Sequence, residues 1–450
     1  MDIYSKYFWI VGGGILQSYM VKEVISRGYI PIITDNDDNC YCRNISDNML
    51  FYKLDTYDVK GHVELFNKLF NDGLDIVGVS TCGADVGITV NYLNVELLNE
   101  SKKSMPYHRI INNKLNIRHS LNSINKSLNP DYFFEYNKFT AGIEAIYNNL
   151  TYKLSYPEIP GNNPLFPCIF KPLSERASRG ITIARNKDEL SLAYDRLTDK
   201  DHFIVEKYHS GTEHSAEMIV DNKGLPVFFN IVDRYFDYSN GVPMEKSHVN
   251  PSNISYIMYE KISMIMMDII KYFNVKRTIL KLDILITNND RIIILEGATR
   301  LSGGFDCQET TPMSTMRNPI GTMVDICVDG ESNIEEYDGS IKNKIEYSKS
   351  YHGKKEYYTI LMPHDKKFNS YVACAAIIAD KEIKFTDKIK NKIEKYLNGE
   401  YYIIIKKDGD VVNSDNNANR IGFIFSKNKD YNKALLRAEG KANNVKRIIG

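Results

Sequence analysis

The chain has 450 residues, of which 57 are Lys or Arg and 57 are Asp or Glu, so its formal net charge is zero. This balance gives no field over the whole chain that would favour nucleic acid or an anionic membrane. At roughly 100–200 residues per domain, the length indicates two to four domains. No stretch reaches about 18 uninterrupted apolar residues, so we expect no membrane span. The seven dispersed cysteines are typical of a protein from a reducing cytosol.

The first part of the chain alternates short apolar runs with helical patterns. The run YFWIVGG precedes the helical stretch GILQSYMVKEVISRG. The runs YIPIITD and LDIVGVSTCG come next, followed by the helical stretch ADVGITVNYLNVELL. Strands that alternate with helices favour a parallel, doubly wound sheet. We therefore predict a first domain of this type over residues 1–111.

The middle of the chain changes in pattern. The segment from residue 111 to about 150 is predicted to be largely helical, and residues 166–233 consist of short apolar runs that predict strands. An amphipathic helix is expected over residues 251–273, because apolar residues recur near i, i+3, i+4 and i+8 and Pro251 and Ser252 open the pattern. The remaining predictions are strands at 278–287 and 291–298, a polar linker or surface segment at 330–350, strands within 371–426 and a helix at 430–445.

Two carboxylates of the predicted strand pair, Asp283 and Glu296, are expected to lie directly opposite each other. If Asn289 and Asp290 form the centre of a tight hairpin turn, the antiparallel register pairs residue 283 with residue 296. Like charges in that position are unfavourable in a sheet, unless a cation lies between them. Mg²⁺ suits such a site, with one or two carboxylates, water and nucleotide phosphate oxygens as ligands. Two surface acids on an edge hairpin are the alternative.

A second group of residues is typical of an anion site. An extended run ends in Lys171, and a loop rich in small residues follows, with Ser178, Arg179 and Gly180. Small residues let backbone N–H groups approach an anion, and the lysine supplies a point charge for phosphate oxygens. There is no G-x-x-x-x-G-K-[ST], so this is not a Walker loop. A solvated lysine at a strand end is the alternative.

A third group surrounds a short hinge between two predicted strands. Glu206 ends one strand, and Glu213 begins the next. The backbone near Lys207 and Tyr208 is placed to read the edge of an adenine, and a carboxylate on either side can accept ribose hydroxyls. Ordinary hairpin charge is the alternative for each glutamate.

The order of these groups along the chain resembles the ATP-grasp superfamily. It is most similar to the branch shared by biotin carboxylase, the purine-biosynthesis members and the carboxylate–amine ligases that act on amino acids. The stretches VGGGILQSYMVKEVISRGYIPIITD, HVNPSNI and RIGFIFSKNKDYNKALLRAEG also resemble that branch, so the resemblance covers nearly the whole chain. The ordered groups are a basic helix face with Lys114 and Arg118, then Lys171, Glu206, Glu213, the pair Asp283 and Glu296, and finally Arg300.

The resemblance implies an α/β architecture of three parts. An ATP-grasp domain over residues 112–335, with a mobile lid at about 150–207, would follow the parallel-sheet domain. A small C-terminal α+β domain over residues 345–450 would complete the core. The implied cofactors are ATP and Mg²⁺, or Mn²⁺ in its place. The implied roles are phosphate contacts for Lys114, Lys171, Ser178, Arg179 and Gly180, adenine contacts for Glu206, Lys207 and Tyr208, a ribose contact for Glu213, Mg²⁺ ligation by Asp283 and Glu296, and catalysis by Arg300 and Lys171.

The implied activity is that of an ATP-dependent carboxylate–amine ligase, which forms a C–N bond and releases ADP and phosphate. It would activate a carboxylate as an acyl phosphate, held by Arg300, before an amine attacks. The partners would be small-molecule substrates, with no nucleic acid and no membrane, and a homodimer is a family expectation. The location would be cytoplasmic.

One departure from the family pattern concerns the metal. The family commonly shows E-x-N-P-R, whereas this chain has Glu296-Gly297-Ala298-Thr299-Arg300. Ala298 lacks the amide oxygen that asparagine gives to a metal, which leaves open whether one or two Mg²⁺ ions bind. Two alternatives for the function also stay open: an ATP-grasp carboxylase that uses bicarbonate, and a catalytically degenerate ATP-binding protein. The sequence does not identify the acid, the amine or the pathway.

Overall fold

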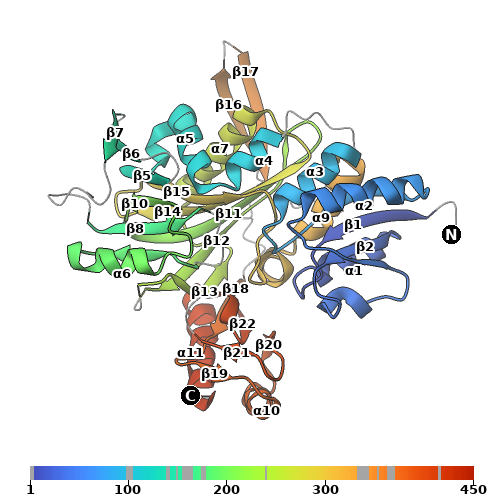
Figure 1. Ribbon diagram of the computed structural model, residues 1–450. Coiled ribbons are helices and arrows are strands. Elements are labelled where there is room, and N and C mark those ends of the chain that lie inside the picture. Colours follow the sequence, from blue (N-terminus) through green and yellow to red (C-terminus); the bar gives the residue numbers. More distant parts are fainter. Residues whose placement is uncertain are drawn as a thin grey trace.

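The computed structural model of the chain describes residues 5–97, 105–137, 142–147, 150–154, 166–173, 179–238, 241–331, 344–351, 354–361, 370–413 and 417–449. The strands in these ranges form sheets of four, six and eight strands and two further strand pairs (Figure 1). Figure 1 shows the eight-stranded sheet in the centre, with the N-terminal domain on one side and the six-stranded sheet on the other. The predicted α/β class is confirmed.

The N-terminal domain is a parallel sheet with helices on both faces, as predicted. Its elements are β1 (Lys6–Val11), α1 (Ser18–Ser26), β2 (Ile30–Asp35), β3 (Leu50–Lys53), α2 (Val59–Asn71), β4 (Asp75–Ser80) and α3 (Gly87–Leu97), to which α9 (Pro319–Asp329) is added from later in the chain. The strand order is β3-β2-β1-β4, and all pairs are parallel. Phe8 and Ile10 of β1 pack with α1 and α9, whereas Trp9 packs with α2 and α3. Burial on both faces explains why β1 is apolar at successive positions.

The six-stranded antiparallel sheet begins earlier than the predicted lid. Helices α4 (Met105–Ile111) and α5 (Lys114–Asn125) precede it, and its order is β7-β6-β5-β10-β8-β9. Its elements are β5 (Tyr132–Asn137), β6 (Gly142–Tyr147), β7 (Leu150–Leu154), β8 (Cys168–Pro172), β9 (Thr182–Ala184), α6 (Leu190–Asp195) and β10 (His202–Lys207). The prediction of a mixed, largely helical segment up to about residue 150 was therefore wrong after α5, because strands begin at Tyr132.

The central eight-stranded sheet combines strands from the middle and the end of the chain, in the order β15-β14-β11-β12-β13-β18-β22-β20. It thus joins strands of the predicted middle and C-terminal domains through the pairing of β13 with β18. Its strands are β11 (Gly211–Val220), β12 (Pro226–Asp237), β13 (Met244–Asn250), β14 (Thr278–Thr287), β15 (Ile292–Ala298), β18 (Tyr371–Ile377), β20 (Tyr401–Ile404) and β22 (Gly422–Asn428).

The two faces of this sheet differ in polarity, because side chains alternate along each strand. On one face, Met218, Ile231 and Leu282 pack against α7 (Tyr256–Phe273) in the largest apolar cluster. The residues between them face the other way, and cross-strand pairs there join Glu217 to Asn230 and Ser215 to Asp283. The polar face of the sheet is therefore the side on which a site is expected.

The C-terminal part packs helices against the end of the central sheet. Helices α10 (Asp387–Tyr396) and α11 (Tyr431–Ile449) share an apolar cluster with β18 and β22. Short strands β19 (Ile383–Lys384) and β21 (Val411–Val412) form a separate pair. Strands β16 (Lys344–Tyr351) and β17 (Lys354–Leu361) form a hairpin, so the stretch predicted to be a linker or surface segment contains a strand from residue 344 onward.

Two further findings concern the helices and the cysteines. In the part of the chain that the structure describes, no helix combines the length and the hydrophobicity needed to cross a membrane. All seven cysteines are free thiols and all are buried.

Candidate active site

The two carboxylates on the β14–β15 hairpin lie opposite each other, as the sequence predicted. The register pairs Asp283 with Glu296, but it reaches that pair by a different route. The loop consists of residues 288–290 instead of Asn289 and Asp290 alone, and Asp290 has a φ of 59°. A bulge next to Asp283 then shifts the register by one residue and restores the predicted pair.

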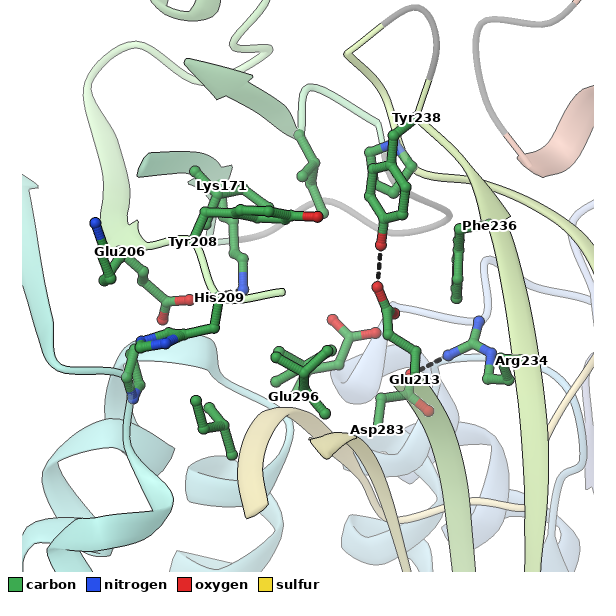
Figure 2. Close-up of a pocket in the computed structure, with 18 of the residues that line it drawn as sticks. Lys171, Glu206, Tyr208, His209, Glu213, Arg234, Phe236, Tyr238, Asp283 and Glu296 are labelled. Atoms are coloured by element: carbon green, nitrogen blue, oxygen red, sulfur yellow. Dashed lines mark hydrogen bonds and ion pairs between the residues drawn. The ribbon is translucent and has the colours of Figure 1, made fainter. Parts of the chain in front are cut away.

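Both carboxylates face one pocket between the central and the six-stranded sheets (Figure 2). Asp283 is buried, with one oxygen 2.5 Å from Nζ of Lys281 and the other 2.9 Å from the Arg234 guanidinium. Burial would raise the pKa of Asp283, but Arg234 and then Lys281 outweigh it and hold the pKa below its usual range. Glu296 is 46% exposed, and one of its oxygens lies 3.7 Å from Nζ of Lys114.

On the six-stranded sheet, Lys171 and Glu206 belong to a buried ion cluster. Glu206 accepts hydrogen bonds from Nζ of Lys171 and Nε of Arg118, each at 2.6 Å. Burial would raise the pKa of Glu206, but the two cations outweigh it and lower the pKa to about 2. Arg118 also donates to the carbonyls of Ile294 and Leu295 on β15. The cluster therefore ties α5, the six-stranded sheet and the carboxylate hairpin together at the pocket.

The opposite wall of the pocket carries Glu213 on β11. Its carboxylate accepts a hydrogen bond from the hydroxyl of Tyr238, and Arg234 is its cross-strand neighbour on β12 (Figure 2). Burial raises the pKa of Glu213, although the Tyr238 hydrogen bond works in the opposite direction. The rings of Tyr208 and Phe236 also line the pocket. This wall therefore offers a carboxylate close to aromatic surface, a combination suited to a nucleoside.

The hinge after β10 contributes two of the predicted residues. Lys207 and Tyr208 both line the pocket. The Tyr208 amide donates to the carbonyl of Pro167 at 3.0 Å, and Nζ of Lys207 donates to the carbonyl of Phe166 at 2.8 Å. The Tyr208 amide is thus used within the protein, which leaves other groups of the hinge for a ligand.

The predicted loop after β8 is placed only in part. Ser178 lies outside the described residues. Arg179 is exposed, and neither it nor Gly180 is among the residues that line the pocket. Gly180 has a φ of +69°, and a Cβ added there would lie 3.0 Å from the backbone nitrogen of Thr198. Glycine is therefore required for the turn itself, whatever else the loop does.

Arg300 lies beyond the carboxylate hairpin and pairs with the N-terminal domain. Its guanidinium donates from Nε to Asp85 at 2.8 Å, and a second nitrogen lies 2.6 Å from the same oxygen. The backbone of Gly83 donates to the carbonyl of Leu301 at 3.0 Å, and Cys82 forms a parallel bridge with Leu301. The loop after β4 and the end of β15 are thus joined at main-chain level, which fixes Arg300 at the boundary between the two domains.

Several residues of the site were not predicted as such. Arg118 looked like part of an ordinary basic helix face, and Tyr238 gave no pattern. Arg234 and Lys281, however, are charges inside strongly apolar strands. Lys281 alternates with Asp283 in TILKLDILIT, which places both on one face of β14. A charged residue two positions from a candidate ligand in the same strand is the signal that would have identified Lys281.

The carboxylate pair fits a metal that is bound together with a nucleotide. Among the described residues, no group of three or more His, Cys, Asp or Glu side chains could hold a metal ion. Mg²⁺ usually binds through one or two carboxylates and completes its shell with water and phosphate oxygens. Asp283 and Glu296 meet that requirement, because they share a pocket that also contains Lys171 and Glu213.

A comparison with known families matches the part of the chain whose two antiparallel sheets enclose this charged pocket. Residues 165–308 match the family model described as the ATP-grasp domain. The match runs from just before β8 to just beyond Arg300, so it includes every pocket strand from β8 to β15. No curated protein sequence matches the chain.

Solved structures extend the likeness to nearly the whole chain. An L-amino acid ligase from Bacillus licheniformis has a TM-score of 0.68 at 14% identity, with 98% of this chain and 97% of that chain covered. Phosphoribosylglycinamide synthetase from Anaerococcus prevotii has a TM-score of 0.63 at 15% identity, with 98% of each chain covered. Carboxyaminoimidazole ribonucleotide synthase from Aspergillus clavatus, complexed with ATP, has a TM-score of 0.65 at 15% identity, with 100% of each chain covered. At these identities, the likeness establishes the ATP-grasp fold.

Proposed function

We propose that the protein is an enzyme, an ATP-dependent carboxylate–amine ligase that forms a C–N bond and releases ADP and phosphate. The observation that carries this proposal is the shared pocket of Lys171, Glu213, Asp283 and Glu296, with Arg300 held beyond it at the domain boundary. The named activities of the structural relatives are compatible with it, since they include an L-amino acid ligase.

The proposed nucleotide position follows the walls of the pocket. Glu213 would accept the ribose hydroxyls, and the purine would lie along the hinge at Lys207 and Tyr208. Nζ of Lys171 would contact phosphate oxygens while Glu206 holds it in place at 2.6 Å. Glu206 would therefore act on the nucleotide through Lys171, since its carboxylate is already taken by two cations.

The proposed chemistry depends on charge neutralisation. Transfer of a phosphoryl group to a carboxylate brings two anions together, so catalysis must come mainly from positioning and from fixed positive charge. Asp283 and Glu296 would hold Mg²⁺ or Mn²⁺, which supplies part of that charge when bound. Lys114 lies near Glu296, where it would contact the phosphates, as would Arg179 and Gly180 of the loop after β8.

Arg300 would bind the substrate carboxylate. Its partner Asp85 keeps the guanidinium at the domain boundary, close to the turn of Ser302, Gly303 and Gly304. An acyl phosphate is destroyed by water, so the six-stranded sheet would have to close over the pocket before reaction. The substrates are proposed to be small molecules in the cytoplasm. A homodimer remains a family expectation.

A phosphate-release screen over pairs of amino acids tests the proposal. We expect ADP and phosphate to form only when both an acid and an amine are present, and Glu296→Ala and Arg300→Ala to abolish that release. Mass spectrometry of the mixture should show one new amide per ADP formed. Release that requires bicarbonate and no organic acid would replace the ligase by a carboxylase. ATP binding without phosphate release for any pair would favour a catalytically degenerate protein.

A further inference from the structure

Lys281 lies across the hairpin from Ala298, the position at which the family pattern has an asparagine. The register of β14 and β15 pairs it directly with Ala298, so that Lys281 and Asp283 face Ala298 and Glu296 across the hairpin. Lys281 is buried, at 8% exposed, and its Nζ lies 2.5 Å from Oδ1 of Asp283. The alanine methyl offers no metal ligand, and the ammonium beside it carries a fixed positive charge.

Asp283 is already neutralised on both of its oxygens. Lys281 takes one, and the guanidinium of Arg234 lies 2.9 Å from the other. Both cations have side chains that are less than one-fifth exposed, so solvent screens them little. A carboxylate with two close cations keeps only limited capacity for a divalent ion. Glu296 is more open, with 46% of its side chain exposed.

The number of protein oxygens also limits the number of metal ions. Mg²⁺ requires a nearly octahedral shell of six oxygen ligands at about 2.1 Å. In the described part of the chain, the pocket provides only the carboxylates of Glu206, Glu213, Asp283 and Glu296. Glu206 is bound to two cations, and Glu213, which lies beside Asp283 on the central sheet, accepts a hydrogen bond from the Tyr238 hydroxyl. One ion can use Asp283, Glu296 and phosphate oxygens, whereas the two remaining carboxylates that line the pocket already accept hydrogen bonds from other side chains of the protein.

We propose that the ammonium of Lys281 takes the place of a second divalent cation, so that the loaded site holds one metal ion per nucleotide. This inference rests on the proposed function, because it requires a nucleotide in the pocket. Lys281 then contributes positive charge through its contact with Asp283, and it needs no coordination shell. The role is to position and neutralise, and the Ala298 side chain leaves the room for it.

Counting bound Mn²⁺ tests this directly. The full chain is mixed with an equimolar non-hydrolysable ATP analogue, and electron paramagnetic resonance measures free and bound Mn²⁺ during a titration. We expect one Mn²⁺ per nucleotide-loaded wild-type chain. We also expect one in Ala298→Asn, because Lys281 still occupies the position. The double variant Lys281→Met/Ala298→Asn should bind two, with the dipolar broadening of a close Mn²⁺ pair.

The controls separate this inference from the proposed function. Lys261→Met removes an exposed lysine of α7 and should leave the count at one. Two Mn²⁺ ions in the wild-type chain would overturn the inference and leave the ligase proposal intact, and so would a folded double variant that binds only one. A wild-type chain that binds no nucleotide analogue in calorimetry would overturn both. The wild-type count decides the question even if the double variant fails to fold.

Discussion

Replacement of Glu206 by glutamine is expected to destabilise the protein by about 3 kcal/mol at pH 7. The pKa of this carboxyl falls from 4.5 to about 2. One pKa unit corresponds to about 1.4 kcal/mol, so the folded state favours the charged form by about 3 kcal/mol. In other proteins, removal of one partner from a buried ion pair lowers the free energy of unfolding by about 3–5 kcal/mol. Lys171 and Arg118 would be left as buried cations without the carboxylate between them.

The direction of the pKa shift determines how the effect of Glu206→Gln changes with pH. The folded-state pKa lies below the unfolded value, so the stabilisation is fully present above about pH 4.5 and is lost as the pH falls toward 2. Urea unfolding of the wild type and of Glu206→Gln at pH 7 measures the full difference in the free energy of unfolding. At pH 3.5 the difference should shrink to about 2 kcal/mol.

A matched control lies in the same sheet. Glu135 on β5 binds Nε2 of His202 at 2.8 Å, but these side chains are 25% and 39% exposed. Exposed pairs contribute about 0–1 kcal/mol, so Glu135→Gln should cost less than about 1 kcal/mol. If Glu206→Gln costs no more than Glu135→Gln, the reasoning from buried charge is refuted.

Three further predictions concern other parts of the molecule. Burial lowers the pKa of His108 to about 3, so the free energy of unfolding should fall as the pH drops below 6.5, the ordinary pKa of histidine. Urea unfolding should show that the wild type loses about 2 kcal/mol between pH 7 and pH 5 and that His108→Phe does not. Asp85→Asn should raise KM for the acid substrate about tenfold and leave KM for ATP unchanged, because Arg300 loses its partner; equal changes in both constants would contradict this. Ser255 caps α7 by accepting from the Met258 amide, so Ser255→Ala should lower the free energy of unfolding by about 1 kcal/mol, and no loss in calorimetry would exclude the cap.

The hairpin illustrates how far sequence reasoning reached in the site. The apolar runs TILKLDILIT and RIIILEGA predicted both strands, and the register of an assumed two-residue turn placed Asp283 opposite Glu296. It did not reveal the left-handed Asp290 or the bulge, because a two-residue and a three-residue loop both suit Asn and Asp. The two differences cancel at the carboxylates, which is why the pair was predicted correctly from an incorrect turn.

Other parts of the site depend on contacts that no local pattern encodes. Arg118 and Glu206 are 88 positions apart, and only the packing of α5 against β10 brings them together. The segment from Tyr132 was expected to be helical, although its aromatic residues favour strands. Burial between antiparallel neighbours, in which Phe134 is 8% exposed, determined the outcome there. Local propensity and burial therefore both favour the strand that forms, against the helical prediction.

The burial of all seven thiols has a practical consequence for testing whether the six-stranded sheet closes over the pocket. A maleimide dye reacts with accessible thiolates, and burial raises the pKa of Cys168 to about 12. A single cysteine introduced at Leu192 of α6 or at Leu436 of α11, which are 49% and 67% exposed, would therefore be labelled alone. Fluorophores at both positions would report by energy transfer whether the six-stranded sheet approaches the rest of the molecule when nucleotide is added.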